Sequence, residues 1–274
     1  MEIRDHRLKG KNVKFKESPN HGGRLVNNVP DTIVIHYTSG GSAEGSVNTL
    51  CNPNRKVSAH LVVGREGSIF QLVEFDTIAW HAGKSSYQGR ASFNNFSIGI
   101  EIDNAGKLNK TEAGYISWFG RNYQPDEVIK AIHRNQNKPA FWHKYSETQI
   151  DLVFEICEQL IKTYPIELIV GHEEISPSRK IDPGPAFPLD KLRNRLLEKD
   201  RIEEGPDEKI ALPERIGFVN APRLNIRANP WLGARTVAPP LTGGTELEIL
   251  DESEDWYHVN VVSKGWVSKK YVST

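Results

Sequence analysis

Two histidines of the 274-residue chain follow apolar runs that are typical of buried strands. His36 lies near the end of the β-branched run Thr32–Tyr37, and His172 comes just after the run Glu167–Val170. Strand ends are where an α/β sheet presents its functional groups. Asp182 follows in a segment rich in proline and glycine, whose restricted backbone can hold a carboxylate in place. Two imidazoles and a carboxylate suit a zinc site that leaves a fourth position for water. The alternative is that each histidine is a structural core residue.

Two further charged residues are candidates for chemistry at such a site. Glu101 interrupts the apolar run Phe96–Ile102, where a charged side chain is unusual. Either strand alternation points it to solvent, or it faces the metal site and acts as a general base. Lys180 lies two residues before Asp182 and can offer its ammonium to a developing oxyanion. A plain surface lysine is the alternative interpretation.

The elements that must position these residues are short strands and one clear helix. Apolar residues between Ile150 and Ile161 recur at helical spacing. Two of the predicted strands flank a Gly-Arg-Glu-Gly turn and so form a hairpin. We therefore expect an α/β or α+β fold with a mixed central β-sheet flanked by helices. The predicted strands are Thr32–Tyr37, Ala59–Val63, Ser68–Val73, Phe96–Ile102 and Glu167–Val170.

The pattern changes towards the C-terminus. Residues 198–214 are mostly charged and are interrupted by proline, which predicts a linker. Short strands separated by Gly, Pro and Asp turns follow in residues 215–274, including Leu224–Arg227, Trp256–Val262 and Gly265–Val267. We expect a first domain over residues 1–197, with its motifs between about 30 and 190, and then a small all-β barrel.

Composition limits the classes of partner. The chain has 35 Lys plus Arg and 35 Asp plus Glu, so its net charge of zero argues against nucleic acid or an anionic membrane as a partner. No apolar run near the N-terminus resembles a signal peptide, and none approaches the about 18 residues of a membrane span. Two cysteines are too few for a disulfide framework. We expect a cytoplasmic protein; release or secretion by a route without a signal peptide is the alternative.

Seven motifs in one order carry a resemblance to a known family. Over about residues 30–190 the chain resembles the zinc-dependent N-acetylmuramoyl-L-alanine amidases, which are related to peptidoglycan recognition proteins and to the anhydro-muropeptide amidase of cell-wall recycling. The resemblance implies hydrolysis of the amide between the lactyl group and L-alanine in peptidoglycan or muropeptide fragments. The motifs are Val34–Tyr37, Val57–His60, Trp80–Gly83, Tyr87–Arg90, Phe96–Glu101, Gly171–His172 and Arg179–Phe187.

The resemblance also implies roles for particular residues. Zinc would be held by His36, His172 and Asp182, and Glu101 and Lys180 would form the catalytic pair. A non-catalytic protein that binds peptidoglycan without cutting it is the alternative. Loss of a zinc ligand would indicate that state, and all three positions are filled here.

Four more residues lie in the matching motifs. Trp80, His81 and Arg90 resemble pocket residues that contact the muropeptide, although Arg90 can equally be a surface arginine on a loop. His60 resembles a buried residue of the sheet rather than a ligand.

Two regions depart from the compact recycling enzyme. The stretch between Asp103 and Thr148 is longer, and its Trp118 and Trp142 either line the cleft or pack an extra helix; we favour packing. This insertion leaves the substrate's length and the preference for an anhydro sugar open. The C-terminal part is similar to bacterial SH3-type domains, and either wall binding or a rigid cap is consistent with it. The sequence makes no prediction of oligomeric state.

Overall fold

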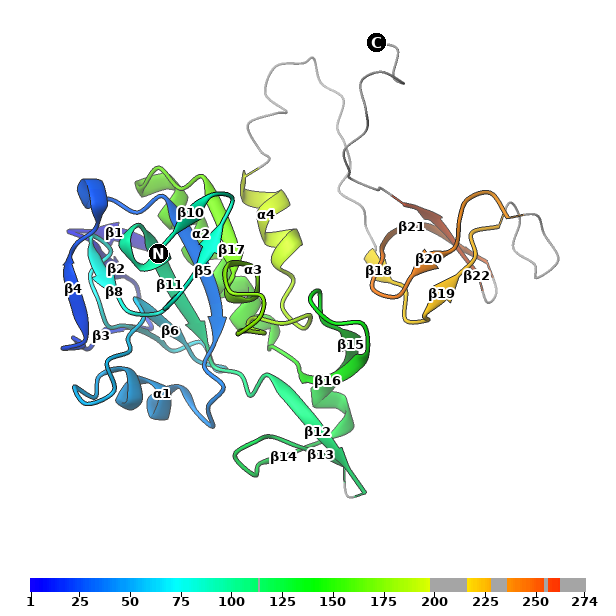
Figure 1. The fold of residues 1–274 in the computed structure, drawn as a ribbon, viewed down its shortest axis with the longest axis horizontal. Coiled ribbons are helices and arrows are strands. Elements are labelled where there is room, and N and C mark those ends of the chain that lie inside the picture. The colour runs from blue at the N-terminus through cyan, green and yellow to red at the C-terminus, as the bar shows by residue number, and fades with distance from the viewer. Residues whose placement is uncertain (113, 198–215, 228–235, 254–255, 262–274) are drawn as a thin grey trace, which may run out of the picture. The chain divides into compact units, whose positions relative to one another are not determined.

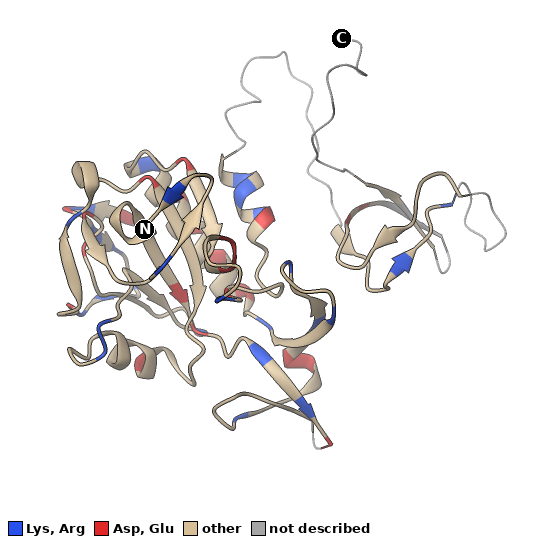
Figure 2. Ribbon diagram, in the orientation of Figure 1, with Lys and Arg blue, Asp and Glu red and all other residues tan. Residues whose placement is uncertain are grey.

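The computed structural model describes residues 1–112, 114–197, 216–227, 236–253 and 256–261. The chain divides into two compact units, Met1–Glu204 and Gly205–Thr274. Within the described residues, no helix is both long and apolar enough to cross a membrane. Charges of both signs are spread over the first unit, in keeping with the zero net charge (Figure 2).

A mixed six-stranded sheet forms the centre of the first unit, in the order β17-β5-β11-β6-β7-β3 (Figure 1). Neighbouring strands are parallel except for β6 and β7, which form the predicted antiparallel hairpin. The prediction of a mixed sheet with helices is therefore confirmed. The strands are β3 (Val13–Phe15), β5 (Thr32–Tyr37), β6 (Leu61–Val63), β7 (Ile69–Gln71), β11 (Ser97–Ile102) and β17 (Leu168–Gly171).

Helices cover both faces of this sheet. On one face, α2 (Glu147–Thr163) and α4 (Leu189–Leu197) pack against alternate residues such as Ile33 and Ile35 of β5. Helix α2 begins with a capping box, in which Ser146 and Gln149 each bond the other's backbone N–H. On the other face, α1 (Ala43–Leu50) packs near β6 and β7.

Strand alternation decides which residues reach each face. In β11, Ile98, Ile100 and Ile102 join the core beneath α2, so Gly99 and Glu101 point to the opposite face. Likewise β5 buries Ile33 and Ile35 under α2, which turns His36 to the same face as Glu101.

Short elements complete the first unit around the main sheet. Strand β8 pairs with β4, and α3 directly follows β17. These elements are β1 (Glu2–Arg4), β2 (Arg7–Lys9), β4 (His21–Arg24), β8 (Thr77–Ala79), β9 (Ser86–Tyr87), β10 (Arg90–Ala91), α3 (His172–Ile175), and the 3-10 turns Val26–Asn28, Phe93–Asn95 and Pro125–Glu127.

The insertion between Asp103 and Thr148 forms a second sheet of five strands, in the order β14-β13-β12-β16-β15. The expected extra helix is therefore wrong for the described part of this stretch. Trp142 is 1% exposed and packs in the interior as favoured, but Trp118 is 71% exposed, so the packing interpretation is wrong for it. The strands are β12 (Lys107–Thr111), β13 (Gly114–Ile116), β14 (Asn122–Tyr123), β15 (Val128–Ile132) and β16 (Pro139–His143).

The second unit contains only strands in its described part, in line with an all-β unit. Three antiparallel strands pair in the order β18-β21-β22, and β19 pairs with β20. A barrel of the SH3 type stays a prediction, because the predicted strand Gly265–Val267 lies outside the described residues. The predicted linker 198–214 also lies outside them, and the boundary between the two units falls within its range. The strands are β18 (Ile216–Phe218), β19 (Arg223–Leu224), β20 (Leu241–Thr242), β21 (Glu246–Ser253) and β22 (Trp256–Asn260).

Candidate metal centre

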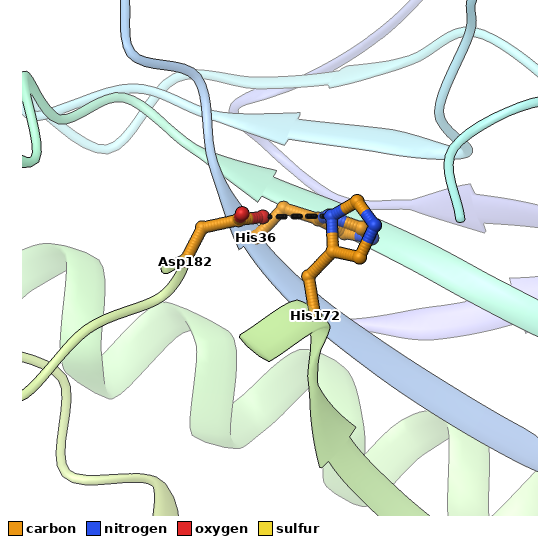
Figure 3. A group of neighbouring side chains, drawn as sticks. All are labelled: His36, His172 and Asp182. Atoms are coloured by element: carbon orange, nitrogen blue, oxygen red, sulfur yellow. Dashed lines mark hydrogen bonds and ion pairs between the residues drawn. The ribbon is translucent and has the colours of Figure 1, made fainter. Parts of the chain in front are cut away.

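Two adjacent parallel strands bring the predicted ligands together. Strand β5 carries His36 near its end, and its neighbour β17 ends at Gly171, directly before His172. Asp182 reaches the same place from a loop, and its backbone carbonyl accepts a hydrogen bond from the Glu173 N–H at 2.8 Å. The three side chains converge on one point (Figure 3).

The converging atoms are nearly equidistant. The Nδ1 atoms of His36 and His172 lie 2.9 Å apart, and Oδ2 of Asp182 lies 3.0 Å from each. All three residues are buried, with exposed fractions of 1%, 2% and 7%. Nitrogen and oxygen ligands of zinc lie about 2.0–2.2 Å from the ion, so ligands of one ion lie close to one another, as these atoms do.

The outer nitrogen of each ring has its own partner. Nε2 of His36 lies 3.0 Å from Nδ1 of His81, and Nε2 of His172 lies 3.1 Å from the Ala82 carbonyl. If each Nε2–H donates there, both Nδ1 lone pairs face the Asp182 carboxylate. Three electron-pair donors then meet in a buried space, which is the arrangement that a bound cation stabilises. The residues present therefore fit zinc.

The pKa shifts of His36 and Asp182 favour the forms that bind a metal. Burial, reinforced by His172, lowers the pKa of His36 to about 4, and burial lowers the pKa of His81 well below its usual value. Burial alone would raise the pKa of Asp182, but the rings of His172 and His36 outweigh it and hold that pKa below its usual range. Neutral imidazoles and an ionised carboxylate are the forms that bind a metal.

Glu101 lies beside this cluster. From strand β11 it lies in register with His36 on the neighbouring strand β5. Its Oε2 atom is buried and has no hydrogen-bond partner among the described residues. Burial, with a smaller contribution from Asp182, raises the pKa of Glu101 well above its usual value, and the Lys180 charge opposes this. The solvent-facing interpretation is therefore wrong for Oε2, and the raised pKa suits a group that accepts and returns a proton.

Lys180 lies within electrostatic reach of the same group. Its positive charge acts to lower the pKa of both Glu101 and His36, as the smallest of the influences on each. The structure thus brings His36, His172, Asp182 and Glu101 together, and the Lys180 charge acts on this group.

The histidines of the matching motifs lie on the same face but differ in their contacts. His81 is 9% exposed and contacts His36, so its position indicates that it orients the His36 ring. The His81 ring occupies the space where a side chain at Gly99 would begin, 2.3 Å from that position. His60 is fully buried and bonds the Gly99 N–H and the Thr77 carbonyl, in line with the expected sheet role.

Arg90 and Trp80 are not among the cluster's contacts. The Arg90 guanidinium binds both carboxylate oxygens of Asp31, at 3.0 and 2.7 Å, and lies 3.8 Å from the centre of the Phe96 ring. Asp31 precedes β5, so this pair lies at the opposite end of that strand from His36. Trp80 is half-buried, and its backbone bonds Ser58. Contacts of Trp80, His81 and Arg90 with substrate stay predictions.

Sequence reasoning missed a buried acid next to the cluster. Glu173 is 2% exposed, and it bonds the His133 ring at 2.6 Å, Arg134 at 2.8 Å and the Gly184 N–H at 3.0 Å. It therefore ties the insertion to the two segments that carry His172 and Asp182. The only signal in the sequence was an acid directly after His172, because its partners lie far away along the chain.

The fold and the site together define an α+β protein with a metallohydrolase-like centre at its strand ends. A family model described as N-acetylmuramoyl-L-alanine amidase matches residues 26–185, and the chain belongs to this family. The prediction of an N-acetylmuramoyl-L-alanine amidase is confirmed.

Individual relatives agree with this assignment. The chain is 32% identical over 199 residues to the 1,6-anhydro-N-acetylmuramyl-L-alanine amidase AmpD of Escherichia coli (strain K12), covering 66% of this chain and 88% of the relative. It is 32% identical over 169 residues to the N-acetylmuramoyl-L-alanine amidase AmiD of the same strain, covering 58% and 51%. A solved structure of AmiD from E. coli with the substrate anhydro-N-acetylmuramic acid-L-Ala-D-γ-Glu-L-Lys has 30% identity and a TM-score of 0.46, covering 61% of this chain and 57% of that one.

Proposed function

We propose that the chain is a zinc-dependent amidase that hydrolyses the bond between the lactyl group of N-acetylmuramic acid and L-alanine. The observation that carries this proposal is the convergence of His36, His172 and Asp182, with Glu101 in register beside them. Zinc in such a site supplies Lewis-acid polarisation of a carbonyl and makes a water molecule more acidic.

Glu101 moves the proton in this proposal. Its carboxylate accepts a proton from the attacking water and returns it to the alanine nitrogen as the C–N bond breaks. The products are a lactyl carboxylate and a peptide with a free amine. A raised pKa makes the Glu101 carboxylate a stronger base than an ordinary glutamate, which supports its role in accepting the proton.

Lys180 stabilises the charge that develops on the carbonyl oxygen. Its place two residues before Asp182, and the action of its charge on Glu101 and His36, support this role. A fixed positive charge in a partly buried site lowers the energy of an oxyanion more than it does in water.

The substrate that we propose is an anhydro-muropeptide, handled in the cytoplasm during cell-wall recycling. The name of the AmpD relative, with its 1,6-anhydro sugar, supports this form. The alternative is intact peptidoglycan, which the protein would meet after release from the cell.

Mass spectrometry of the reaction products tests the function and separates the two substrates. The protein is incubated with small anhydro-muropeptides and, in parallel, with intact sacculi. We expect free stem peptides beginning with L-alanine from the small substrate, and none from the Glu101→Gln variant. Binding of the muropeptide without any product would favour the non-catalytic recognition protein instead.

A further inference from the structure

A shallow groove of about 290 Å³ lies beside the metal centre. Tyr37 and Ile181, which line it, are the chain neighbours of the ligands His36 and Asp182. The insertion contributes Lys107, Asn109 and Trp118 to its lining.

Trp118 presents a fixed aromatic surface to this groove. Its indole is 71% exposed, yet its Nε1–H donates to the carbonyl and the hydroxyl oxygen of Ser39, both at 2.9 Å. The Phe119 ring packs against it edge-on, with 5.6 Å between the ring centres. An aromatic side chain already held in place loses little conformational entropy when a ligand packs on it.

Lys107 and Asn109 present polar groups on the same side of β12. They alternate with Leu108, which is buried, so both point away from the core. Among the described residues, the Lys107 ammonium has no ion-pair partner. Basic residues on β12 are visible in Figure 2.

The residue before β12 packs closely on Tyr37, the chain neighbour of His36. Gly106 has a φ of +72°, and the Tyr37 ring occupies the space where a side chain at Gly106 would begin, at 2.4 Å. Lys107 therefore follows a backbone position that packs directly on the neighbour of His36.

We propose that this groove binds the stem peptide of the muropeptide, with a peptide carboxylate on Lys107 and apolar peptide atoms on the face of Trp118. The inference rests on the proposed function. In such a substrate the lactyl carboxyl is consumed in the scissile amide, so the negative charges lie in the peptide. A γ-linked glutamate leaves its α-carboxylate free, and Lys107 can pair with it.

Steady-state kinetics on two matched substrates test the pairing. One is anhydro-N-acetylmuramic acid-L-Ala-D-γ-Glu-L-Lys, and the other carries an amide in place of the glutamate α-carboxylate. The Lys107→Met variant should raise KM about tenfold for the first substrate and leave the second unchanged, with kcat unchanged for both. Lys110→Met is the matched control, because Lys110 is exposed on the same strand at a position of opposite parity.

The aromatic wall has its own test. The Trp118→Ala variant should raise KM for both substrates without changing kcat, because packing on the indole does not depend on the carboxylate. The Trp118→Phe variant keeps an aromatic ring but loses the Nε1 hydrogen bonds to Ser39, so it should lie between the wild type and Trp118→Ala.

The outcomes separate this inference from the proposed function. If the wild type cleaves the muropeptide but Lys107→Met changes neither KM, or changes both equally, the groove assignment is overturned. If the wild type cleaves neither substrate, the proposed function fails, and calorimetric binding of the tripeptide L-Ala-D-γ-Glu-L-Lys decides the groove alone. Binding weakened about tenfold by Lys107→Met then supports it, and equal binding overturns it.

Discussion

The two imidazoles of the metal centre are oriented by partners of different kinds. His172 has a backbone carbonyl, that of Ala82, behind its outer nitrogen, whereas His36 has the ring of His81. A backbone carbonyl accepts a hydrogen bond at any accessible pH. The His81 ring accepts one only while its Nδ1 carries no proton. Burial favours the neutral ring by lowering its pKa, and the Ser97 carbonyl beside Nε2 favours the tautomer with the proton on Nε2.

The first prediction at this scale concerns Glu101. The Glu101→Gln variant has nearly the same shape but cannot accept a proton, so turnover should fall by about 10²- to 10⁴-fold. Its zinc content and melting temperature should stay at wild-type values, because no described ligand contacts the changed atom. Single-turnover hydrolysis measures the turnover, metal analysis the zinc content, and thermal unfolding the melting temperature. Near wild-type turnover would remove Glu101 from the mechanism.

A second prediction separates two roles for His81. If it orients His36, the His81→Ala variant should lower zinc affinity by about 10- to 100-fold, as loss of such partners does at other metal sites. His81→Gln, whose amide oxygen can still accept from Nε2–H of His36, should retain more of that affinity. Competition with a chelating indicator measures the affinity. An unchanged affinity with a raised KM would mean that His81 contacts substrate only.

The grouping of His36, His172 and Asp182 could be predicted from sequence, but the partners of these residues could not. His36 and His172 follow recognisable strands, so their meeting at one edge follows from parallel pairing. The contact of His81 with His36 spans 45 residues and depends on the absence of a side chain at Gly99. Neither spacing nor hydropathy encodes such a contact.

At the scale of elements, apolar runs were reliable where strands are buried on both faces. Strand β5 occupies the predicted range, and β11 and β17 differ from theirs by a single residue at one or both ends. The insertion was not predictable, because its strands are short and mostly half-exposed, with weak alternation. Its exposed Trp118 and buried Trp142 look alike in the sequence and differ only through tertiary packing.

A pH-dependent contribution to stability belongs to this scale, because His60 joins two strand segments. Its ring accepts from the Gly99 N–H at 3.0 Å and donates to the Thr77 carbonyl at 2.9 Å, which uses both nitrogens of the neutral form. Burial lowers the pKa of His60 to about 4 in the folded protein. The unfolded chain binds this proton at a pKa of about 6.5, so it holds more protons between these two values.

The free energy of unfolding should therefore fall as the pH falls from about 6.5 towards about 4, with about 3 kcal/mol of the loss from His60. Above that range His60 contributes no slope. Denaturant unfolding of the wild type and of His60→Gln across this range isolates the effect from the other histidines, since the variant should show a shallower slope. Parallel pH profiles for the two proteins would contradict this assignment.

At the scale of the whole molecule, the metal centre and the groove lie entirely within the unit Met1–Glu204. A chain that ends at Glu204 should therefore fold, bind zinc and cleave small muropeptides at the full-length rate. If the second unit binds the cell wall, its removal should weaken action on insoluble sacculi through lost effective concentration. Assays on both substrates with both chains measure this, and equal loss on the two substrates would count against a wall-binding role.

The central claim is that His36, His172 and Asp182 hold the zinc on which hydrolysis of the lactyl-L-alanine amide depends. The most direct measurement is the rate of that hydrolysis by the full chain, first stripped of metal by a chelator and then titrated with zinc. We predict no hydrolysis without metal, and recovery that rises with zinc and reaches a plateau at about one ion per chain. Full hydrolysis of the amide by metal-free protein would contradict the account.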